Sequence, residues 1–369
     1  MRKIFKNLIT LEEAENIFYS KLKISLLTKF ESIDLFKAVG RMISESVISS
    51  IDIPPFDRAT YDGFAVIGSD TFGADEESPV ELKVKGHLLP GDIWKGRLQS
   101  QQAIEISTGA VMPSGANAVI MVEETQMIKK NQEIIVKLFK PVAPNDNISS
   151  AGSDIAYGET IVYKNTIITP RETSLLAAVG IQTIKVIKKP RVAIISTGTE
   201  IQSQKFPLDA GKIYDINTQT IFDGVIQSGA EPIIYGIFPD DFDSIQSVLN
   251  KALLECELIT ISGGTSAGMG DIIYEVINSL GSPGILCHGI RLAPGKPTIL
   301  AMINFKPIIG LPGYPTSALM VFDLIVTPLI NKILRSKSVP REILVAKTPV
   351  RLQSIVGRKQ FLLVSVTKT

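Results

Sequence analysis

Cysteine and histidine are scarce in this chain, which has two of each among its 369 residues. Cys256 and Cys287 are far apart in apolar surroundings, a pattern that predicts buried small side chains rather than a disulfide or a metal pair. A zinc site is therefore not expected, and neither is a Ser-His-acid or Cys-His catalytic set. Any metal should be a hard cation held by carboxylate oxygens, for which Mg²⁺ is the first candidate.

An excess of charge and long apolar runs are also missing. The 38 Lys and Arg residues balance 37 Asp and Glu residues, so the net charge of +1 favours neither nucleic acid nor an acidic membrane surface. We find no signal-peptide core and no apolar run that we expect to cross a bilayer, which predicts a soluble, cytoplasmic protein. The length predicts two to four domains.

Two common nucleotide-binding loops are absent. The sequence G-x-x-x-x-G-K-[ST] does not occur, because Pro297 follows Gly295-Lys296. The chain has instead an apolar run, 258–261, that breaks into a loop rich in glycine and hydroxyl groups and ends on Asp271 before a helical pattern. This loop also lacks the G-x-G-x-x-G fingerprint. A strand, a glycine loop and a helix together present backbone N–H groups to an anion, so we expect a phosphate site, with a plain tight turn as the alternative.

Alternating strand and helix patterns predict an α/β domain over residues 189–332. The expected strands lie at 191–196, 232–238, 258–261 and 307–311, and the expected helices follow the caps Asn217 and Asp243 and cover 272–280 and 316–330. This alternation predicts three layers around a mostly parallel sheet, which binds ligands beyond the carboxyl ends of its strands.

The rest of the chain predicts three further domains. Short β-rich runs between turn signals predict a small inserted β domain over 51–143. Segments 1–50 and 144–188 predict one discontinuous N-terminal domain, whose first helix opens with a capping box at Thr10 and Glu13. The β texture of 333–369, at 342–345 and 361–364, predicts a C-terminal β segment too short to be stable alone.

Acidic side chains follow three of the expected parallel strands. Glu200 comes after the first strand, Asp240 after the second, and Asp271 closes the glycine-rich loop after the third. Three carboxylates at one edge of a sheet repel one another unless they share a cation, so they predict an Mg²⁺ site. For any single acid, a helix cap or a solvated loop is the alternative.

Other loops add to this candidate site. Lys296 is held in a Pro-Gly-Lys-Pro turn, and residues 312–317 form a glycine turn with hydroxyl groups. Residues 57–63 and 106–113 of the β domain also carry more polar groups than a connector needs. Together these features predict a site for a phosphate ester with a bridging Mg²⁺.

Seven motifs occur at 57–66, 107–113, 152–154, 196–200, 262–271, 294–297 and 311–317. In content and order they resemble those of the MoeA family, the molybdopterin molybdenumtransferases of molybdenum cofactor biosynthesis, which are related to the gephyrin E domain. The resemblance covers nearly the whole chain. It implies a metal-binding cytoplasmic homodimer that takes adenylylated molybdopterin (molybdopterin-AMP) and molybdate, uses magnesium (Mg²⁺), and releases AMP and the molybdenum-loaded cofactor. It also implies an active cleft between the α/β domain of one subunit and the β domain of the other.

The resemblance also implies the residues of this site. Glu200, Asp240 and Asp271 would handle Mg²⁺ and phosphate, Lys296 the charge of the anion, and Asp62 and Thr108 molybdate or pterin across the interface. The further implied substrate-binding residues are Asp154, Thr197, Gly198, Ser262, Gly263, Gly264, Thr265, Ser266, Arg291, Gly295, Pro312, Pro315 and Ser317.

The chain departs from the family pattern at two places. Ala293 stands where many members have lysine, and Arg291 is the candidate for replacing the lost charge, although arginine differs from lysine in reach and geometry. Related chains continue beyond the position of Thr369, so the C-terminal β domain is expected to be incomplete.

Three alternatives stay open. The chain could be a molybdopterin adenylyltransferase or nucleotide-cleaving enzyme with the same α/β fold, or a non-catalytic scaffold like gephyrin, or a transferase that prefers tungstate. The β insertion with its Asp62 loop argues against the first alternative, and the intact acids argue against the second. The two oxyanions are nearly alike in size and charge, so the sequence does not choose between them. Other enzymes of cofactor biosynthesis are expected partners.

Overall fold

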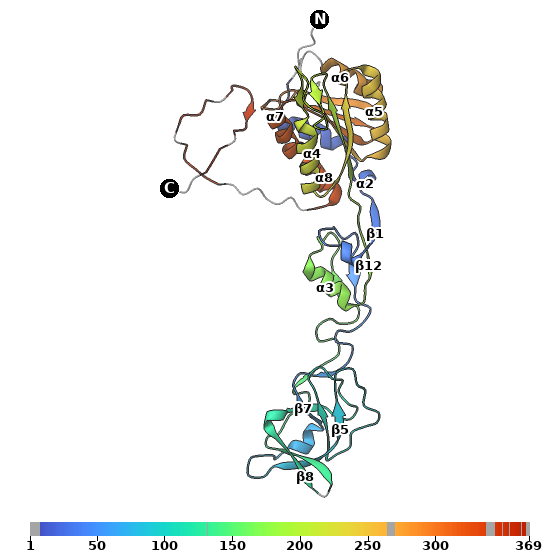
Figure 1. Cartoon of the computed structure of the whole chain (residues 1–369). Helices are drawn as coiled ribbons and strands as arrows, with labels where there is room; N and C mark the ends of the chain where they lie inside the picture. The colour runs from blue at the N-terminus through green and yellow to red at the C-terminus, as the bar shows by residue number, and fades with distance from the viewer. Residues whose placement is uncertain are drawn as a thin grey trace. The chain divides into compact units, whose positions relative to one another are not determined.

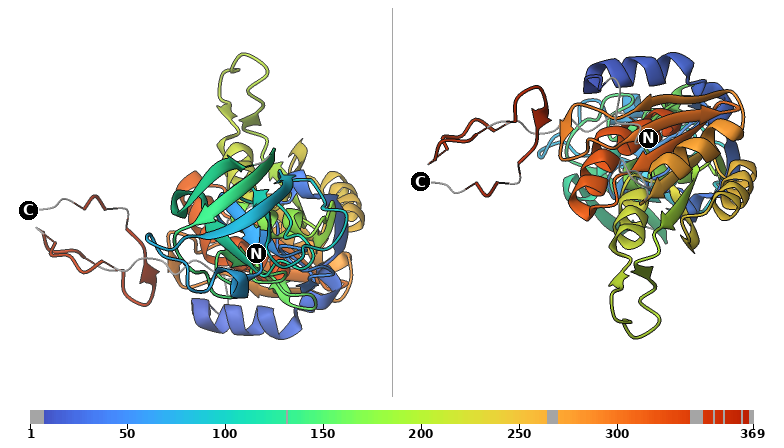
Figure 2. Two further views of the ribbon diagram at one scale, coloured as in Figure 1. Left: turned by 90° about the horizontal axis from the view of Figure 1, so that it is seen from below. Right: turned by 90° about the horizontal axis from the view of Figure 1, so that it is seen from above.

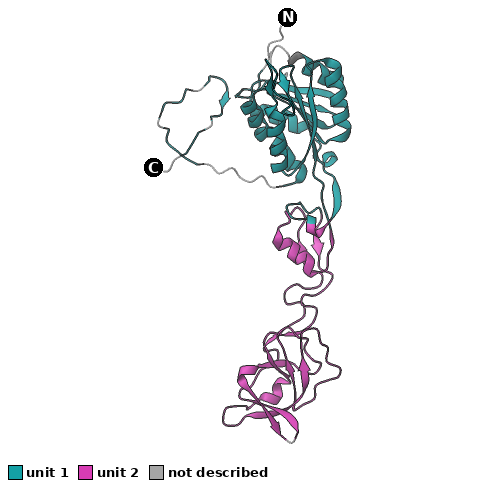
Figure 3. Ribbon diagram, viewed as in Figure 1, with its two compact units in different colours: residues 1–33, 37–44, 184–369 teal, residues 34–36, 45–183 magenta. Residues whose placement is uncertain are grey.

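The computed structural model describes residues 8–130, 132–263, 270–336, 344–348, 350–353, 355–362 and 364–366, with the backbone alone for Gly270 and Asp271. The chain forms two compact units (Figure 3). Unit 1 comprises Met1–Ile33, Lys37–Ser44 and Ile184–Thr369, and unit 2 comprises Asp34–Phe36 and Glu45–Thr183. Unit 2 is therefore inserted into the sequence of unit 1.

Unit 1 is built around a six-stranded sheet in the order β16-β13-β17-β21-β20-β18. Its strands are β13 (Arg191–Thr197), β16 (Glu231–Phe238), β17 (Leu258–Ser262), β18 (Pro283–His288), β20 (Ile299–Ile303) and β21 (Lys306–Leu311). The first four strands in the sheet order are parallel, and β20 and β18 continue the sheet antiparallel. Burial on both faces explains why the inner parallel strands β13, β17 and β21 read as nearly continuous apolar runs.

The antiparallel strands β18 and β20 are not among the strands expected from the sequence. A tight turn at Asn304 and Phe305, with φ of 49° and 65°, joins β20 to β21. Such two-residue turns need positive φ, and Asn-Gly is their usual sequence signal. Here phenylalanine stands in place of the glycine, so the sequence does not indicate the turn. Because β20 runs backwards, its first residue, Ile299, pairs with Gly310 near the end of β21.

Helices cover both faces of this sheet (Figure 1). On one face, α1 (Leu11–Lys21), α4 (Ile216–Gln227), α7 (Pro315–Val321), the π-helical turn Phe322–Val326 and α8 (Thr327–Leu334) share a core with alternate strand residues such as Val192 and Ile194. On the other face, α5 (Phe242–Glu255) and α6 (Gly270–Ser279) pack with Ala193 and Ile195. The result is a three-layer α/β/α arrangement.

The N-caps of helices α4 and α5 lie two residues before the expected caps. Asp215 caps α4 by accepting a hydrogen bond from the Thr218 backbone N at 3.0 Å, and Asp241 caps α5 in the same way. Asn217 and Asp243, expected as the caps, therefore lie inside the first turns. This difference leaves the buried side chain of Asn217 available for another role.

One helical stretch, Pro315–Leu334, is long and apolar enough to cross a membrane by length and composition, which corrects the expectation that no run qualifies. Half of its most apolar window is buried in the structure. Its side chains Val321, Phe322, Leu329 and Ile330 belong to the core that α1 and α4 also cover. Packing within unit 1 thus accounts for the apolar character of this stretch.

The N-terminal residues divide between two packing partners. The capping box at Thr10 and Glu13 is present, and α1 buries Leu11, Ala14 and Phe18 in the core of the α/β sheet. By contrast, β1 (Phe30–Asp34) pairs with β12 (Thr183–Ile187), and β2 (Val47–Ile48) pairs with β11 (Thr160–Val162). The expected division into four domains stays a prediction.

Unit 2 contains a mixed six-stranded sheet in the order β7-β4-β6-β5-β9-β8. Its strands are β4 (Gly63–Val66), β5 (Val80–Leu88), β6 (Gln102–Ile106), β7 (Ala118–Met121), β8 (Thr125–Lys130) and β9 (Glu133–Leu138). The unit also contains α3 (Pro170–Ala178) and the short pair β3 (Arg58–Ala59) and β10 (Ile148–Ser149). Apolar side chains fill a core on each face of the sheet.

Several further short elements belong to unit 1. They are α2 (Ile24–Leu27), β14 (Ile201–Gln202) with β15 (Ile213–Tyr214), and β19 (Leu292–Ala293) with β22 (Lys359–Gln360). The segment between β14 and β15 projects away from the body of unit 1 (Figure 2, yellow-green). Within the described residues after Leu334, β22 is the only strand, so no strand forms in the described parts of the expected β segments 342–345 and 361–364.

Candidate functional site

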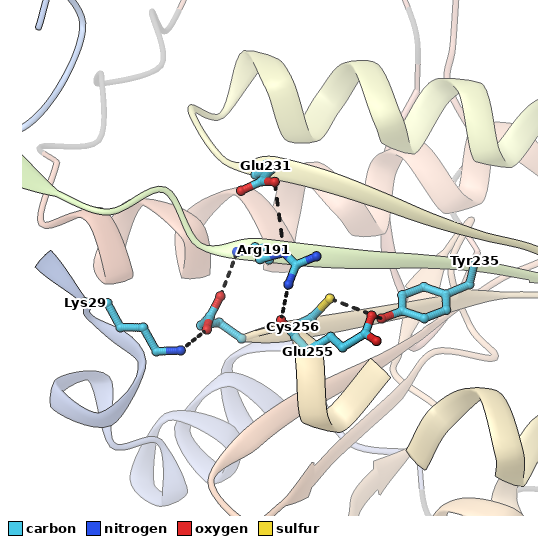
Figure 4. A network of polar contacts seen from close by, with 7 residues as sticks. Lys29, Arg191, Glu231, Tyr235, Glu255 and Cys256 are labelled. Carbon is cyan, nitrogen blue, oxygen red and sulfur yellow. Dashed lines mark hydrogen bonds and ion pairs between the residues drawn. The ribbon is translucent and has the colours of Figure 1, made fainter. Parts of the chain in front are cut away.

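The amino edge of the unit 1 sheet is closed by paired polar groups. Glu257, only 6% exposed, accepts hydrogen bonds from Lys29 Nζ at 2.7 Å and from the Arg191 backbone N at 2.8 Å. Arg191 also donates to the Glu255 carbonyl, and the Tyr235 hydroxyl donates to Glu255 Oε2 at 2.7 Å (Figure 4). The buried charge at this edge has its partners within the chain, which is typical of a structural network.

The carboxyl edge of the same sheet is different. Within the described part of the chain, the buried polar atoms without a hydrogen-bond partner include Thr197 Oγ1, Asn217 Oδ1 and Asp240 Oδ2. Thr197 ends β13, Asn217 lies in the first turn of α4, and Asp240 follows β16. A buried polar atom left without a partner costs about 1–3 kcal/mol. Several such atoms at one edge therefore indicate a place where a ligand binds.

Glycines bring the loops of this edge into contact. Gly263 follows β17 with φ of +101°, and a Cβ atom there would lie 2.0 Å from the Thr197 carbonyl oxygen. A Cβ atom at Gly313, after β21, would lie 3.5 Å from the Gly263 Cα. Beneath them, the hydroxyl oxygens of Ser196 and Ser262 are 3.3 Å apart. The loops after β13, β17 and β21 thus meet backbone to backbone, which only glycine permits at Gly263.

Two of the predicted metal ligands, Glu200 and Asp240, lie close enough to interact. Burial raises the pKa of the Asp240 carboxyl, and the charge of Glu200 raises it further. The Thr199 backbone and the nearby Thr197 hydroxyl, which makes no hydrogen bond of good geometry, act in the opposite direction. The Glu200 carboxylate folds over Gly198, where an added Cβ would meet its oxygens at 2.9 and 3.0 Å. Two carboxylates that repel each other, one with an unpaired oxygen, fit a hard cation such as Mg²⁺.

The third predicted ligand, Asp271, belongs to the first turn of α6, which places its backbone at the same edge. Its side chain lies outside the described residues, as do the predicted residues Gly264, Thr265 and Ser266. Among the side chains that the structure describes, no three acidic, histidine or cysteine groups gather into a metal-binding cluster. The contribution of Asp271 to an Mg²⁺ site stays a prediction.

Lys296 lies at this edge because its loop leads into the antiparallel strand β20. The turn is fixed by two hydrogen bonds: the Thr298 hydroxyl donates to the Gly295 carbonyl at 2.7 Å, and the Ile290 backbone N donates to the Lys296 carbonyl at 3.0 Å. Lys296 helps to line a cavity of about 440 Å³, to which Arg358 and other residues near the C-terminus also contribute.

Arg291, the candidate for the charge lost at Ala293, contacts the N-terminal segment. Its Nε donates to the Leu8 carbonyl at 2.9 Å, and its backbone N donates to the Ile9 carbonyl at 2.8 Å. Arg358, which the sequence reasoning did not single out, shares the cavity with Lys296. Compensation by Arg291 stays a prediction.

In unit 2, Asp62 and Thr108 lie together although 46 residues separate them. The antiparallel pairing of β4 with β6, in which Gly63 faces Ile106, brings their loops side by side. Asp62 Oδ1 accepts hydrogen bonds from the Thr108 backbone N at 2.7 Å and from its hydroxyl at 2.9 Å. These bonds lower the pKa of Asp62, the backbone bond most. The predicted residue Asp154 is instead 3.5 Å from the Arg58 guanidinium.

The other predicted residues, Pro312, Pro315 and Ser317, follow β21 at the carboxyl edge. Asn217 is the residue that sequence reasoning treated only as a cap. Its Nδ2 donates to the Gly313 carbonyl at 2.9 Å, so it belongs to the same group of loops. The available signal was Asp215, a better-placed cap two residues earlier, which made a capping role for Asn217 unnecessary.

Two protein-family models match the chain. Residues 9–180 match the MoeA N-terminal region (domain I and II), and residues 193–332 match a probable molybdopterin binding domain. The molybdopterin molybdenumtransferase of Bacillus subtilis is 34% identical over 82% of this chain and 70% of its own length. That of Nostoc sp. is 34% identical over 88% of this chain and 74% of its own length. The chain belongs to the MoeA family.

Solved structures agree with this membership. A molybdopterin biosynthesis MoeA protein of Pyrococcus horikoshii superposes with a TM-score of 0.79 at 40% identity, over 89% of this chain and 81% of that one. A second MoeA structure from Pyrococcus horikoshii gives a TM-score of 0.72 at 32% identity, over 90% of this chain and 81% of that one. The predicted family and the multi-domain α/β fold are confirmed, and the chain is an enzyme of molybdenum cofactor biosynthesis.

Replacing Gly263 by alanine tests the contact between the loops. Gly40→Ala is the control, since Gly40 also has positive φ (+78°) but a Cβ atom there meets nothing within 4 Å. Both variants should carry backbone strain on the order of 1 kcal/mol. Gly263→Ala should lower the free energy of unfolding by about 1–3 kcal/mol more than Gly40→Ala does, because its Cβ collides with the Thr197 carbonyl. Urea unfolding measures both losses, and equal losses would contradict the close approach.

Proposed function

We propose that the chain inserts molybdate into adenylylated molybdopterin and releases AMP, with Mg²⁺ as cofactor, as a cytoplasmic homodimer. The observation that carries this proposal is the group of unpaired buried polar atoms beside Glu200 and Asp240 at the carboxyl edge. It is supported by family relatives that are named molybdopterin molybdenumtransferase. Those names give the reaction class. The carboxyl edge has carboxyl groups for a cation and unpaired polar atoms for a ligand, which this reaction requires.

The phosphates of the substrate would bind where helix N-termini and Lys296 supply positive charge. Both α4 and α5 begin at the carboxyl edge, and the N-terminus of a helix attracts anions through its free N–H groups. The lack of a side chain at Gly263 lets the loop after β17 lie against Thr197, which brings the start of this loop to the same edge. Hydrogen bonds of its turn fix the backbone of Lys296 at this edge of the sheet.

Glu200 and Asp240, with Asp271, would hold the Mg²⁺ ion. When bound there, the ion would neutralise phosphate charge and polarise a phosphoryl oxygen as AMP leaves. Burial is the main cause of the raised pKa of Asp240, and the cation would relieve the repulsion by Glu200 that adds to it. We therefore expect the cation to favour the carboxylate form of Asp240.

Asp62 and Thr108 of the other subunit would hold the pterin rather than molybdate. The hydrogen bonds from Thr108 lower the pKa of Asp62, so this carboxyl is ionised at neutral pH. A carboxylate repels an oxyanion, whereas it accepts hydrogen bonds from the N–H groups of a pterin ring. The negative charge of Asp62 thus favours pterin over molybdate as the ligand of this pair.

AMP release from adenylylated molybdopterin tests the proposal. With Mg²⁺ and molybdate, the purified chain should release AMP, and Asp240→Asn or Asp271→Asn should lower kcat/KM by at least about 100-fold through loss of a metal ligand. Asp243→Asn is the matched control, because Asp243 is an exposed acid three residues after Asp240. Measuring the rate of AMP release with tungstate in place of molybdate shows which of the two oxyanions the enzyme prefers.

Each of the other results points to one alternative. AMP release that needs no oxyanion would favour a nucleotide-cleaving enzyme. No release with either oxyanion, at confirmed substrate binding, would favour a scaffold without catalysis. A near wild-type rate for Asp271→Asn would remove that residue from the metal site.

Mixing two inactive variants tests the shared active site. Asp62→Asn and Asp240→Asn would each inactivate both sites of their own homodimer. After dissociation and random reassociation, half of the dimers carry one variant of each kind, and one of their two sites has both wild-type residues. Activity should therefore return to about a quarter of the wild-type rate. No recovery, with mixed dimers shown by native mass spectrometry, would place both residues in a site within one subunit.

A further inference from the structure

Asn217 is held in one orientation by the loop that follows β21. Its side chain is 4% exposed, and its Nδ2 donates to the Gly313 carbonyl at 2.9 Å. A carbonyl oxygen can only accept, so this bond fixes which end of the amide is nitrogen. The other end, Oδ1, is therefore an acceptor, and it has no hydrogen-bond partner.

The neighbouring hydroxyl groups are engaged elsewhere. Thr218 Oγ1 lies 2.6 Å from Asp215 Oδ2 and 3.0 Å from Ser196 Oγ, and the Thr218 backbone N donates to Asp215. The helix cap is thus complete without Asn217. A buried acceptor that neither caps the helix nor finds a donor costs about 1–3 kcal/mol, unless a ligand supplies one.

The position of Asn217 places this acceptor in the candidate site. Its partner Gly313 approaches Gly263, and Gly263 approaches Thr197, whose own hydroxyl is among the unpaired buried atoms. These contacts link Asn217 to the edge where Asp240 also has an unpaired oxygen. The acceptor thus belongs to the same group of loops as the residues proposed for substrate binding.

The chemistry of an amide oxygen selects the part of the ligand that can pair with it. Ionised phosphate and molybdate oxygens are acceptors and cannot satisfy Oδ1, whereas an N–H or O–H group can. We infer that Asn217 is a substrate-binding residue that accepts a hydrogen bond from the pterin ring or from the nucleoside, and not from the phosphates. This inference rests on the proposed function, because it takes its ligand from that reaction.

Calorimetric titration with two separate ligands, pterin and AMP, tests the inference without turnover. Asn217→Leu should weaken binding of one of the two by about tenfold, the loss expected for one hydrogen bond to a buried group, and leave the other unchanged. The weakened ligand identifies the donor as pterin or nucleoside. Gln219→Leu is the matched control, since Gln219 is exposed on the same turn of α4, and it should bind both ligands as the wild type does.

A second arm changes the ligand, and its first step uses only the wild-type protein, so that step does not depend on whether Asn217→Leu folds. Pteridine lacks the N–H donors of pterin, 2′,3′-dideoxy-AMP lacks the ribose hydroxyls, and purine riboside monophosphate lacks the adenine amino group. One of them should bind the wild type about tenfold more weakly than its parent ligand. Asn217→Leu should bind that analogue and its parent with equal affinity, because the hydrogen bond is already lost in the variant, as in a double-mutant cycle.

The failures are distinguishable. If the wild type binds pterin or AMP, and neither Asn217→Leu nor any analogue changes the affinity, Asn217 is not a ligand of the substrate and the proposed function stands. If the wild type binds neither pterin nor AMP, the proposed function fails and this inference fails with it.

Discussion

The contact of Gly263 with the Thr197 carbonyl is the constraint on which the candidate site depends. A Cβ atom at Gly263 would lie 2.0 Å from that oxygen, so the loops after β13 and β17 can meet only through a residue without a side chain. Gly313 extends this contact to the loop after β21 and, through its carbonyl, orients Asn217. Polar groups from several segments of the chain are thereby gathered at one edge of the sheet, where the hydroxyl groups of Ser196, Ser262 and Thr218 also link β13, β17 and α4.

The two edges of the same sheet use their buried polar groups differently. At the amino edge, the Glu257 carboxylate is paired with Lys29 and with the Arg191 backbone, so its burial is compensated within the chain. At the carboxyl edge, the unpaired oxygens of Thr197, Asn217 and Asp240 are uncompensated. A fold tolerates unpaired buried polar atoms where a bound ligand forms the missing hydrogen bonds. The large apolar cores on both faces of the sheet offset the loss of stability in the free protein.

Those parts of the fold that depend on local pattern could be predicted. The parallel strands read as apolar runs, and Glu200 and Asp240 are predicted as site residues because each follows such a run. The antiparallel strands could not be predicted in this way, because the turn at Asn304 and Phe305 lacks the glycine that usually indicates a tight turn. The role of Asn217 depends on Gly313, 96 residues away, and no periodicity in the sequence reports a contact of that kind. The family itself was recognisable from its motifs, since seven short patterns in one order are specific even though each is modest.

Deuterium exchange of backbone amides, with and without saturating AMP, tests most directly whether the carboxyl edge is the binding surface of unit 1. If it is, AMP should slow exchange by several-fold in residues 197–202, 215–219 and 312–316, where the glycine-linked loops and the start of α4 lie. Residues 255–258 and 191 at the amino edge should exchange as before, because their network is complete without a ligand. Protection confined to the amino edge, or no protection at the carboxyl edge under saturating AMP, would contradict this assignment.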